Sequence, residues 1–221
     1  MSTSNGPSDV SFGWGILGPG RIAEKFCADL ALVPGARLAA VGSRSSERAE
    51  AFSARHGGRA HASYAALVED PEVDIVYVAS PHSLHFSHAA MALEAGKAVL
   101  CEKPLTLDVE AAKALFELAD RHSGFLMEAM WMTCNPLIHK VRRLLGQESY
   151  GSPKQVHADL GFVAAHDPAD RLWDSQLGAS VLLDMGIYPL TFAHLLLGPP
   201  QSLAASAHVV DGVDANLAIS G

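Results

Sequence analysis

Six residues constrain this chain more than any others: Gly18-Pro19-Gly20-Arg21-Ile22-Ala23, which lie between an apolar run and a helical pattern. In such a G-x-G-x-x-A sequence, the first glycine permits a tight turn and the second lets a pyrophosphate approach the backbone. Ala23 is small enough for the helix to pack closely on the strand, and the helix N-terminus attracts an anion. An ordinary glycine-rich turn is the alternative. The surrounding strand–helix–strand pattern favours a dinucleotide-binding loop.

Strand and helix patterns alternate through the first half of the chain. The predicted strands are Phe12–Leu17, Arg37–Gly42, Val73–Ala79, Ala98–Cys101 and Phe125–Ala129. The predicted helices are Arg21–Leu32, Ser46–His56, Ser63–Val68, Leu84–Ala95 and Leu107–His122. Alternation with nearly continuous apolar strands predicts a parallel sheet that is covered on both faces.

The pattern changes after about Trp131. Asn135 is predicted to cap a helix from Pro136 to Leu145, and Leu183–Leu197 is a long apolar helix. Three further runs resemble strands: Gln155–Phe162, Leu203–Val210 and Ala215–Ser220. The fold class is therefore α/β, a Rossmann parallel sheet followed by an α+β domain whose mostly antiparallel sheet is incomplete here. We predict a flexible tail at 1–11, a Rossmann domain at 12–131 and a partial C-terminal substrate and oligomerisation domain at 132–221.

The composition of the 221 residues indicates a soluble protein with a packed core, because 49% are apolar and 18% are charged. The net charge of −8 argues against nucleic-acid and membrane partners, and the apolar stretch 181–200 is interrupted by Asp184, Pro189 and His194. Three cysteines without a C-x-x-C pair fit a reducing compartment. The polar N-terminus lacks a signal-peptide pattern, so we expect a cytoplasmic location.

The end of the second strand bears on the choice of cofactor. NAD enzymes usually place a carboxylate there to accept a hydrogen bond from the ribose 2′-hydroxyl. This chain instead has Gly42-Ser43-Arg44-Ser45. Serine hydroxyls donate hydrogen bonds, and arginine pairs with phosphate, so NADP is favoured over NAD. The alternative is that Arg44 is a solvated surface charge.

Three residues are candidates for proton transfer. Lys103 follows a predicted strand at its carboxyl end, where open α/β sheets bind ligands. Asp184 and Tyr188 are four residues apart, so a helix places them on one face. A cation near a tyrosine helps it to act at neutral pH, and Lys103 is the candidate cation. The alternatives are a surface lysine, a helix-capping aspartate and a half-buried aromatic ring.

A metal site is a weaker interpretation. His82, His85 and His88 recur every three residues, but no acidic or cysteine ligand stands at a useful spacing. We therefore predict no metal and assign these histidines to the helix start and the pocket lining. His82 follows a strand end, where contact with a cofactor or substrate is expected.

The order of these motifs resembles the glucose-fructose oxidoreductase / inositol dehydrogenase (Gfo/Idh/MocA) family. The segments that carry the resemblance are the Gly18–Ala23 loop, Glu102-Lys103-Pro104 and the Asp184–Tyr188 block. Ala79-Ser80-Pro81-His82, Met127–Trp131 and Leu183–Leu190 are similar to the branch with dimeric dihydrodiol dehydrogenase and NADP-dependent D-xylose dehydrogenase. The chain departs from that pattern in Gly178-Ala179-Ser180, where relatives often have a run of glycines, and in its shorter length.

The resemblance implies hydride transfer between a nicotinamide and a sugar or cyclic diol carbon. It implies that Lys103 is the catalytic lysine, that its bond to Pro104 is often cis, that Tyr188 is the acid/base, and that Asp184 positions the substrate. A homodimer through the C-terminal sheet is expected for a full-length member. A non-catalytic dinucleotide-binding regulator or an inactive fragment remains the alternative. The candidate cofactor-binding residues are Gly18, Pro19, Gly20, Arg21, Ile22, Ser43, Arg44, Ser80, Pro81, His82, Glu102 and Lys103.

Overall fold

The computed structural model describes residues 11–147, 150–167 and 170–221. Nearly all of the predicted tail therefore lies outside the described residues. The chain forms two compact units, and each is described by itself. Unit 1 comprises the chain up to Ser80, Leu84–Glu102 and Asp108–Glu128, and unit 2 comprises Pro81–Ser83, Lys103–Leu107 and Ala129–Gly221. The segment that begins at Lys103 thus groups with unit 2, although the sequence interpretation placed it inside the Rossmann domain.

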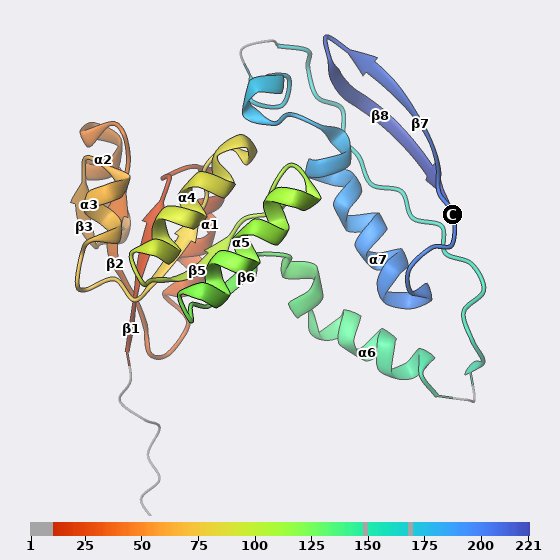
Figure 1. The fold of residues 1–221 in the computed structure, drawn as a ribbon, viewed down its shortest axis with the longest axis horizontal. Helices are drawn as coiled ribbons and strands as arrows, with labels where there is room; N and C mark the ends of the chain where they lie inside the picture. Colours follow the sequence, from red (N-terminus) through yellow and green to blue (C-terminus); the bar gives the residue numbers. More distant parts are fainter. Residues whose placement is uncertain (1–10, 148–149, 168–169) are drawn as a thin grey trace, which may run out of the picture. The chain divides into compact units, whose positions relative to one another are not determined.

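Unit 1 is built on a six-stranded parallel sheet of order β3-β2-β1-β4-β5-β6. Its strands are β1 (Phe12–Leu17), β2 (Ala36–Gly42), β3 (Arg59–His61), β4 (Ile75–Val78), β5 (Ala98–Cys101) and β6 (Leu126–Glu128). Its helices are α1 (Arg21–Leu30), α2 (Ser46–His56), α3 (Tyr64–Val68), α4 (His85–Glu94) and α5 (Val109–Arg121). Figure 1 shows α4 and α5 beside each other, next to the strands β5 and β6.

Both faces of this sheet are covered, as the sequence predicts. Val76, Tyr77 and Val78 are consecutive in β4 and each is at most 1% exposed. Because successive strand side chains point to opposite faces, three buried residues in a row require cover on both sides. The prediction of a Rossmann-type α/β fold followed by an antiparallel sheet is confirmed. Strand β3 is not predicted from the sequence, because its three residues are too few to show a period.

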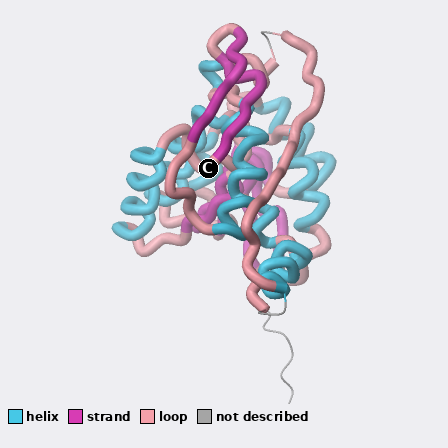
Figure 2. Tube along the Cα trace, turned by 90° about the vertical axis from the view of Figure 1, so that its right-hand side faces the viewer, coloured by secondary structure: helices cyan, strands magenta, loops and turns pink. Residues whose placement is uncertain are grey.

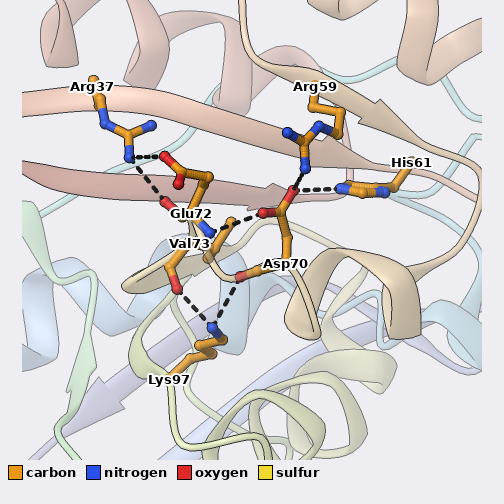
Figure 3. Close-up of polar contacts among 7 residues, drawn as sticks. All are labelled: Arg37, Arg59, His61, Asp70, Glu72, Val73 and Lys97. Carbon is orange, nitrogen blue, oxygen red and sulfur yellow. Dashed lines mark hydrogen bonds and ion pairs between the residues drawn. The ribbon is translucent and has the colours of Figure 1, made fainter.

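The buried carboxylate of Asp70 forms hydrogen bonds with strand β3 and with the turn before β4 (Figure 3). The Asp70 side chain is 1% exposed, and its Oδ2 accepts from Arg59 at 3.0 Å and from His61 at 2.8 Å. Its Oδ1 accepts from the Glu72 backbone N–H at 2.9 Å. Lys97 Nζ donates to the backbone carbonyls of Asp70 and Val73. These contacts connect β3 to the turn that leads into the central strand β4.

Unit 2 contains helices and one antiparallel hairpin. Its elements are η1 (His82–Leu84, which ends at the border with unit 1), η2 (Trp131–Cys134), α6 (Pro136–Leu145), η4 (Ser175–Leu177), η5 (Leu182–Gly186), α7 (Ile187–Leu197), β7 (Ala204–Val210) and β8 (Val213–Ser220). Asn135 Oδ1 caps α6 by accepting from Leu137 N–H, as the sequence indicates. The β7–β8 hairpin turns at Asp211 and Gly212, which both have positive φ. The side chains of β7 are mostly exposed, and dimer formation through this sheet stays a prediction.

The predicted strand at Gln155–Phe162 is wrong. These residues belong to a long stretch of loop, which Figure 2 draws in pink. A strand needs a neighbouring backbone to complete its hydrogen bonds, and within the described part of unit 2 only β7 and β8 pair with each other. Alternating side chains alone therefore do not produce a strand here.

The run Ser175–Leu197 is long and apolar enough to cross a membrane by length and composition, with a mean hydropathy of 1.5. Its helix is interrupted, however, because Gly178 has a φ of +82° and ends the short η4 turn. The run also contains Asp184, a charged residue in an ion pair. The absence of a membrane partner stays a prediction.

Candidate functional site

The glycine-rich loop joins β1 to α1 in unit 1 and makes a tight turn there. Gly18 has a φ of +97°, which side chains rarely permit, and its N–H donates to the Gly42 carbonyl of β2 at 3.2 Å. A Cβ on Gly20 would meet no atom within 4 Å, so the space beside its backbone is open. Gly20 caps α1 without a side-chain hydrogen bond, which leaves the first N–H groups of the helix for an anion. These residues fit a bound pyrophosphate.

The segment after β2 presents one exposed cation. Arg44 is exposed, while Ser43 is 4% exposed and accepts from the Ser45 N–H through its hydroxyl. The Ser45 hydroxyl caps α2 by accepting from Arg48 N–H and donates to Glu47. Ser45 is therefore committed to the helix start, and Arg44 is the group in this segment best suited to a 2′-phosphate.

Two buried histidines hold the backbone at the end of β4. His85 Nε2 lies 2.9 Å from the Ser80 carbonyl, and His88 Nδ1 lies 2.9 Å from the Ser80 hydroxyl. Burial lowers the pKa of His88 to about 4, with smaller contributions from His85 and Arg44, so its ring is neutral at pH 7. Within the described residues, no group of three His, Cys, Asp or Glu is placed to hold a metal ion. His85 and His88 instead position Ser80, a candidate cofactor-binding residue.

Glu102 is held by a tyrosine from the central strand. The Tyr77 hydroxyl donates to Glu102 Oε1 at 2.5 Å, and Phe26 of α1 stacks on the Tyr77 ring at 4.0 Å between ring centres. Burial and the neighbouring Glu102 carboxylate raise the pKa of Tyr77 far above its ordinary value, so this phenol stays protonated and donates. The contact fixes the carboxylate of the residue that immediately precedes Lys103 in the chain.

An ion pair between Lys103 and Asp184 forms the centre of the candidate site in unit 2. Lys103 Nζ donates to Asp184 Oδ1 at 2.5 Å and to the Asp184 carbonyl at 2.8 Å. The two side chains are 11% and 17% exposed, so water screens this pair weakly. Asp184 also lies 3.8 Å from Arg171 Nη1 and 4.0 Å from His82 Nε2. One carboxylate thus has three basic side chains around it.

The charge state of Asp184 follows from this environment. Burial pushes the pKa of its carboxyl upward, but the hydrogen bond and charge of Lys103, together with the charges of Arg171 and His82, outweigh burial. The pKa is therefore below its ordinary value, and Asp184 is an anion at neutral pH. The Lys103–Pro104 peptide bond is cis.

Lys103 also contacts the ring of Tyr188. The ammonium group lies 5.2 Å from the centre of the Tyr188 ring, within the range of a cation–π contact. Trp131 Nε1 donates to the Tyr188 hydroxyl oxygen at 3.0 Å. Asp184 belongs to the π-helical turn η5 and Tyr188 to α7, rather than to one continuous α-helix. Single π-turns inside helices occur frequently at functional sites.

A cavity of about 750 Å³ opens beside this ion pair within unit 2. Its lining includes His82, Arg171, Asp184, Trp173 and Asn216. Among the described residues, neither Lys103 nor Tyr188 belongs to that lining. The cavity therefore meets the ion pair at the Asp184 side, and its volume is in the range of small-molecule sites.

The structure thus divides the candidate residues between the two units. Gly18–Ile22, Ser43, Arg44, Ser80 and Glu102 belong to unit 1, and Pro81, His82, Lys103, Asp184 and Tyr188 belong to unit 2. Sequence patterns assign no role to Arg171, Trp131 or Tyr77. A polar-tipped aromatic in the middle of an apolar strand needs a hydrogen-bond partner, and that signal points to Tyr77. Arg171 and Trp131 carry no comparable signal.

Comparison with known proteins agrees with these two units. Residues 12–130 match the oxidoreductase family with an NAD-binding Rossmann fold (GFO_IDH_MocA). Residues 138–220 match the C-terminal domain of the same family. The chain belongs to the Gfo/Idh/MocA family.

Relatives in this family include enzymes that use NADP. The D-xylose 1-dehydrogenase (NADP⁺) of Hypocrea jecorina is 39% identical over 93% of this chain and 60% of its own length. The trans-1,2-dihydrobenzene-1,2-diol dehydrogenase of Danio rerio is 35% identical over 94% of this chain and 63% of its own length. The crystal structure of KijD10, a 3-ketoreductase from Actinomadura kijaniata in complex with NADP, has a TM-score of 0.71 and 31% identity over 89% of this chain and 58% of that one. The chain spans about 60% of the length of these relatives.

Proposed function

We propose that this chain carries the cofactor loop and the proton-transfer residues of an NADP-dependent oxidoreductase that acts on a hydroxyl carbon of a sugar or a cyclic diol. The Lys103–Asp184 ion pair beside the Tyr188 ring carries the proposal. A protein that only senses a dinucleotide needs the Gly18–Ala23 loop and has no use for a buried lysine fixed beside a phenol. The named activities of the xylose and dihydrodiol dehydrogenases support this substrate class.

The chain's own residues bind the cofactor and move one proton. A bound nicotinamide supplies the carbon that accepts or returns a hydride. Gly18, Gly20 and the start of α1 would hold the pyrophosphate, and Arg44 would pair with the 2′-phosphate. Asp184 fixes the Lys103 ammonium, whose charge favours negative charge on a nearby oxygen. In the oxidative direction the phenolate form of Tyr188 takes the proton of the substrate hydroxyl as the carbon loses its hydride, and in the reverse direction the neutral phenol returns that proton to the carbonyl oxygen.

Arg44→Asp is expected to weaken NADPH binding and to shift the preference toward NADH. The substitution replaces a phosphate-pairing cation with the carboxylate that accepts from a ribose 2′-hydroxyl in NAD enzymes. A charge-assisted hydrogen bond contributes about 1.5–3 kcal/mol, so the ratio of the NADH and NADPH Kd values should fall by roughly 10- to 100-fold. Fluorescence titration of the purified chain with each nucleotide measures this ratio.

Arg48→Asp is the matched control, because it makes the same charge change on the exposed side of α2. It should move the ratio only slightly. An equal change in both variants would mean that long-range charge, rather than a phosphate contact of Arg44, sets the preference.

Tyr188→Phe tests the enzymatic proposal directly. Removal of the phenol oxygen leaves no group at this position to exchange the substrate proton, so kcat should fall by about 10²- to 10⁴-fold. NADPH affinity should stay within about twofold, because no part of the phosphate site changes. The measurement is NADP⁺ reduction at 340 nm with aldoses and cyclic diols.

Tyr150→Phe is the matched control, since Tyr150 is 65% exposed and stands outside the candidate site. Its turnover should equal that of the wild type. If Tyr188→Phe kept its turnover, Tyr188 would not be the acid/base. A wild-type chain that bound NADPH but converted no substrate would instead favour the non-catalytic alternative.

A further inference from the structure

We infer that Trp131 is a positioning residue for Tyr188, and that its indole N–H sets the direction in which the phenol proton points. The inference rests on the proposed function and deepens it by adding a residue that aligns the acid/base. The relevant contact is the hydrogen bond of 3.0 Å between Trp131 Nε1 and the Tyr188 hydroxyl oxygen.

The chemistry of the two groups fixes the direction of this hydrogen bond. An indole N–H can only donate, whereas a phenol oxygen has one hydrogen to donate and two lone pairs that accept. Trp131 therefore donates and Tyr188 accepts. With one lone pair engaged by the indole, the phenol O–H cannot point at Trp131 and must point away from it. A neutral Tyr188 is thereby aligned to donate its proton to another acceptor, such as a substrate carbonyl oxygen.

Two further contacts fix the Tyr188 ring while the indole fixes its oxygen. Lys103 Nζ lies 5.2 Å from the centre of the ring, and the Trp131 ring lies 5.7 Å from it at an angle of 54°. The cation restrains the position of the ring, but it does not select a rotation of the O–H group. The indole N–H is therefore the contact that performs this selection.

The position of Trp131 in the chain allows this role. Trp131 is the first residue of η2, directly after Met130, which is 5% exposed. Trp131 itself is 61% exposed, so it contributes little to a core. An exposed tryptophan whose N–H reaches a phenol is better explained by its polar contact than by burial of its ring.

Trp131→Phe is the test substitution, since it keeps an aromatic ring and removes the N–H donor. Loss of one neutral hydrogen bond to the acid/base should lower kcat about 3- to 10-fold, with KM within about twofold. A role confined to folding would change the melting temperature, and a role confined to substrate binding would change KM. Neither would lower kcat while KM and the melting temperature stay constant. Because the side chain is 61% exposed, Trp131→Phe should leave the melting temperature unchanged, and thermal unfolding verifies this.

A spectroscopic measurement tests the contact without any turnover. The chain has three tryptophans, so a ¹⁵N-labelled sample gives three indole N–H resonances, and Trp131→Phe assigns one of them. Tyr188→Phe should shift the Trp131 resonance, because it removes the acceptor oxygen. The Trp173 resonance should stay in place, because its Nε1 donates to the Ala165 carbonyl at 2.8 Å.

The two measurements separate this inference from the proposed function. An unmoved Trp131 resonance in Tyr188→Phe would overturn the inference, as would an unchanged kcat in Trp131→Phe. A wild-type chain without turnover would count against the proposed function alone, and the resonance would then decide the contact. A shifted resonance together with a kcat loss at constant KM would establish Trp131 as a positioning residue.

Discussion

Lys103→Met is expected to lower kcat by about 10²- to 10⁴-fold, the range for loss of a group that supports proton transfer at the reacting oxygen. Methionine keeps an unbranched side chain of similar length and removes the charge. The substitution takes away the cation beside the Tyr188 ring and both hydrogen bonds that Lys103 donates to Asp184. Steady-state kinetics with NADP⁺ and the best aldose or diol measure the loss.

The same change leaves the Asp184 carboxylate without its strongest partner. Lys103 makes the main contribution that lowers the Asp184 pKa, so the pKa should rise in Lys103→Met and stability should fall. Lys103→Met/Asp184→Asn removes both charges and is the matched control for folding. We expect this double variant to regain thermal stability while its turnover stays low. Turnover that returned together with stability would mean that Lys103 acts only through the fold.

Asp70→Ala is expected to lower the free energy of unfolding by about 3 kcal/mol, which corresponds to a melting temperature about 10 °C lower. The loss arises because His61 and the Glu72 N–H lose a buried, charged acceptor (Figure 3). Arg59 is 60% exposed and can return to water, so it contributes less. Thermal unfolding followed by circular dichroism measures the change.

Glu72→Ala is the matched control within the same cluster. The Glu72 side chain pairs with Arg37 at 2.7 Å, but the two are 58% and 44% exposed, and exposed pairs contribute about 0–1 kcal/mol. The Glu72 backbone N–H that Asp70 uses remains in this variant. Equal losses in both variants would contradict the dominant role of the buried carboxylate.

The contribution of Asp70 to the free energy of unfolding should decrease as the pH falls. Burial raises the pKa of Asp70, but the Glu72 N–H, His61 and Arg59 together outweigh burial, so the folded-state pKa lies below the ordinary value of an aspartate. A carboxyl with a lowered folded-state pKa stabilises the protein above its unfolded-state pKa, and the stabilisation disappears as the pH falls through the folded-state pKa. The stability difference between wild type and Asp70→Asn should therefore be constant near pH 7 and shrink below about pH 4.

Local sequence patterns were sufficient to predict those features of the structure that depend on residues adjacent in the chain. The Gly18–Ala23 loop, the cap of α6 at Asn135 and the Asp211-Gly212 turn all lie where the sequence predicts them. Each depends on the backbone preferences of a few adjacent residues. The parallel sheet was also predictable, because strands buried on both faces need consecutive apolar residues.

Tertiary structure decided that the segment Gln155–Phe162 forms a loop and not a strand. The side chains alternate as in a strand, but a strand also depends on a second backbone that accepts and donates its hydrogen bonds. Alternation describes one chain segment and carries no information about that partner. In the described part of unit 2 the segment stays a loop.

The sequence by itself determined the Rossmann fold, the position of the glycine-rich loop and the residue types that we propose for proton transfer. Only the tertiary structure decided how those residues meet: Lys103 contacts Asp184 across 81 residues, and Trp131 donates to Tyr188 across 57. Sequence periodicity reports the faces of single helices and strands. Contacts between distant segments depend instead on the path of the whole chain, because hydrogen bonds and ion pairs require their atoms to approach within a few ångströms.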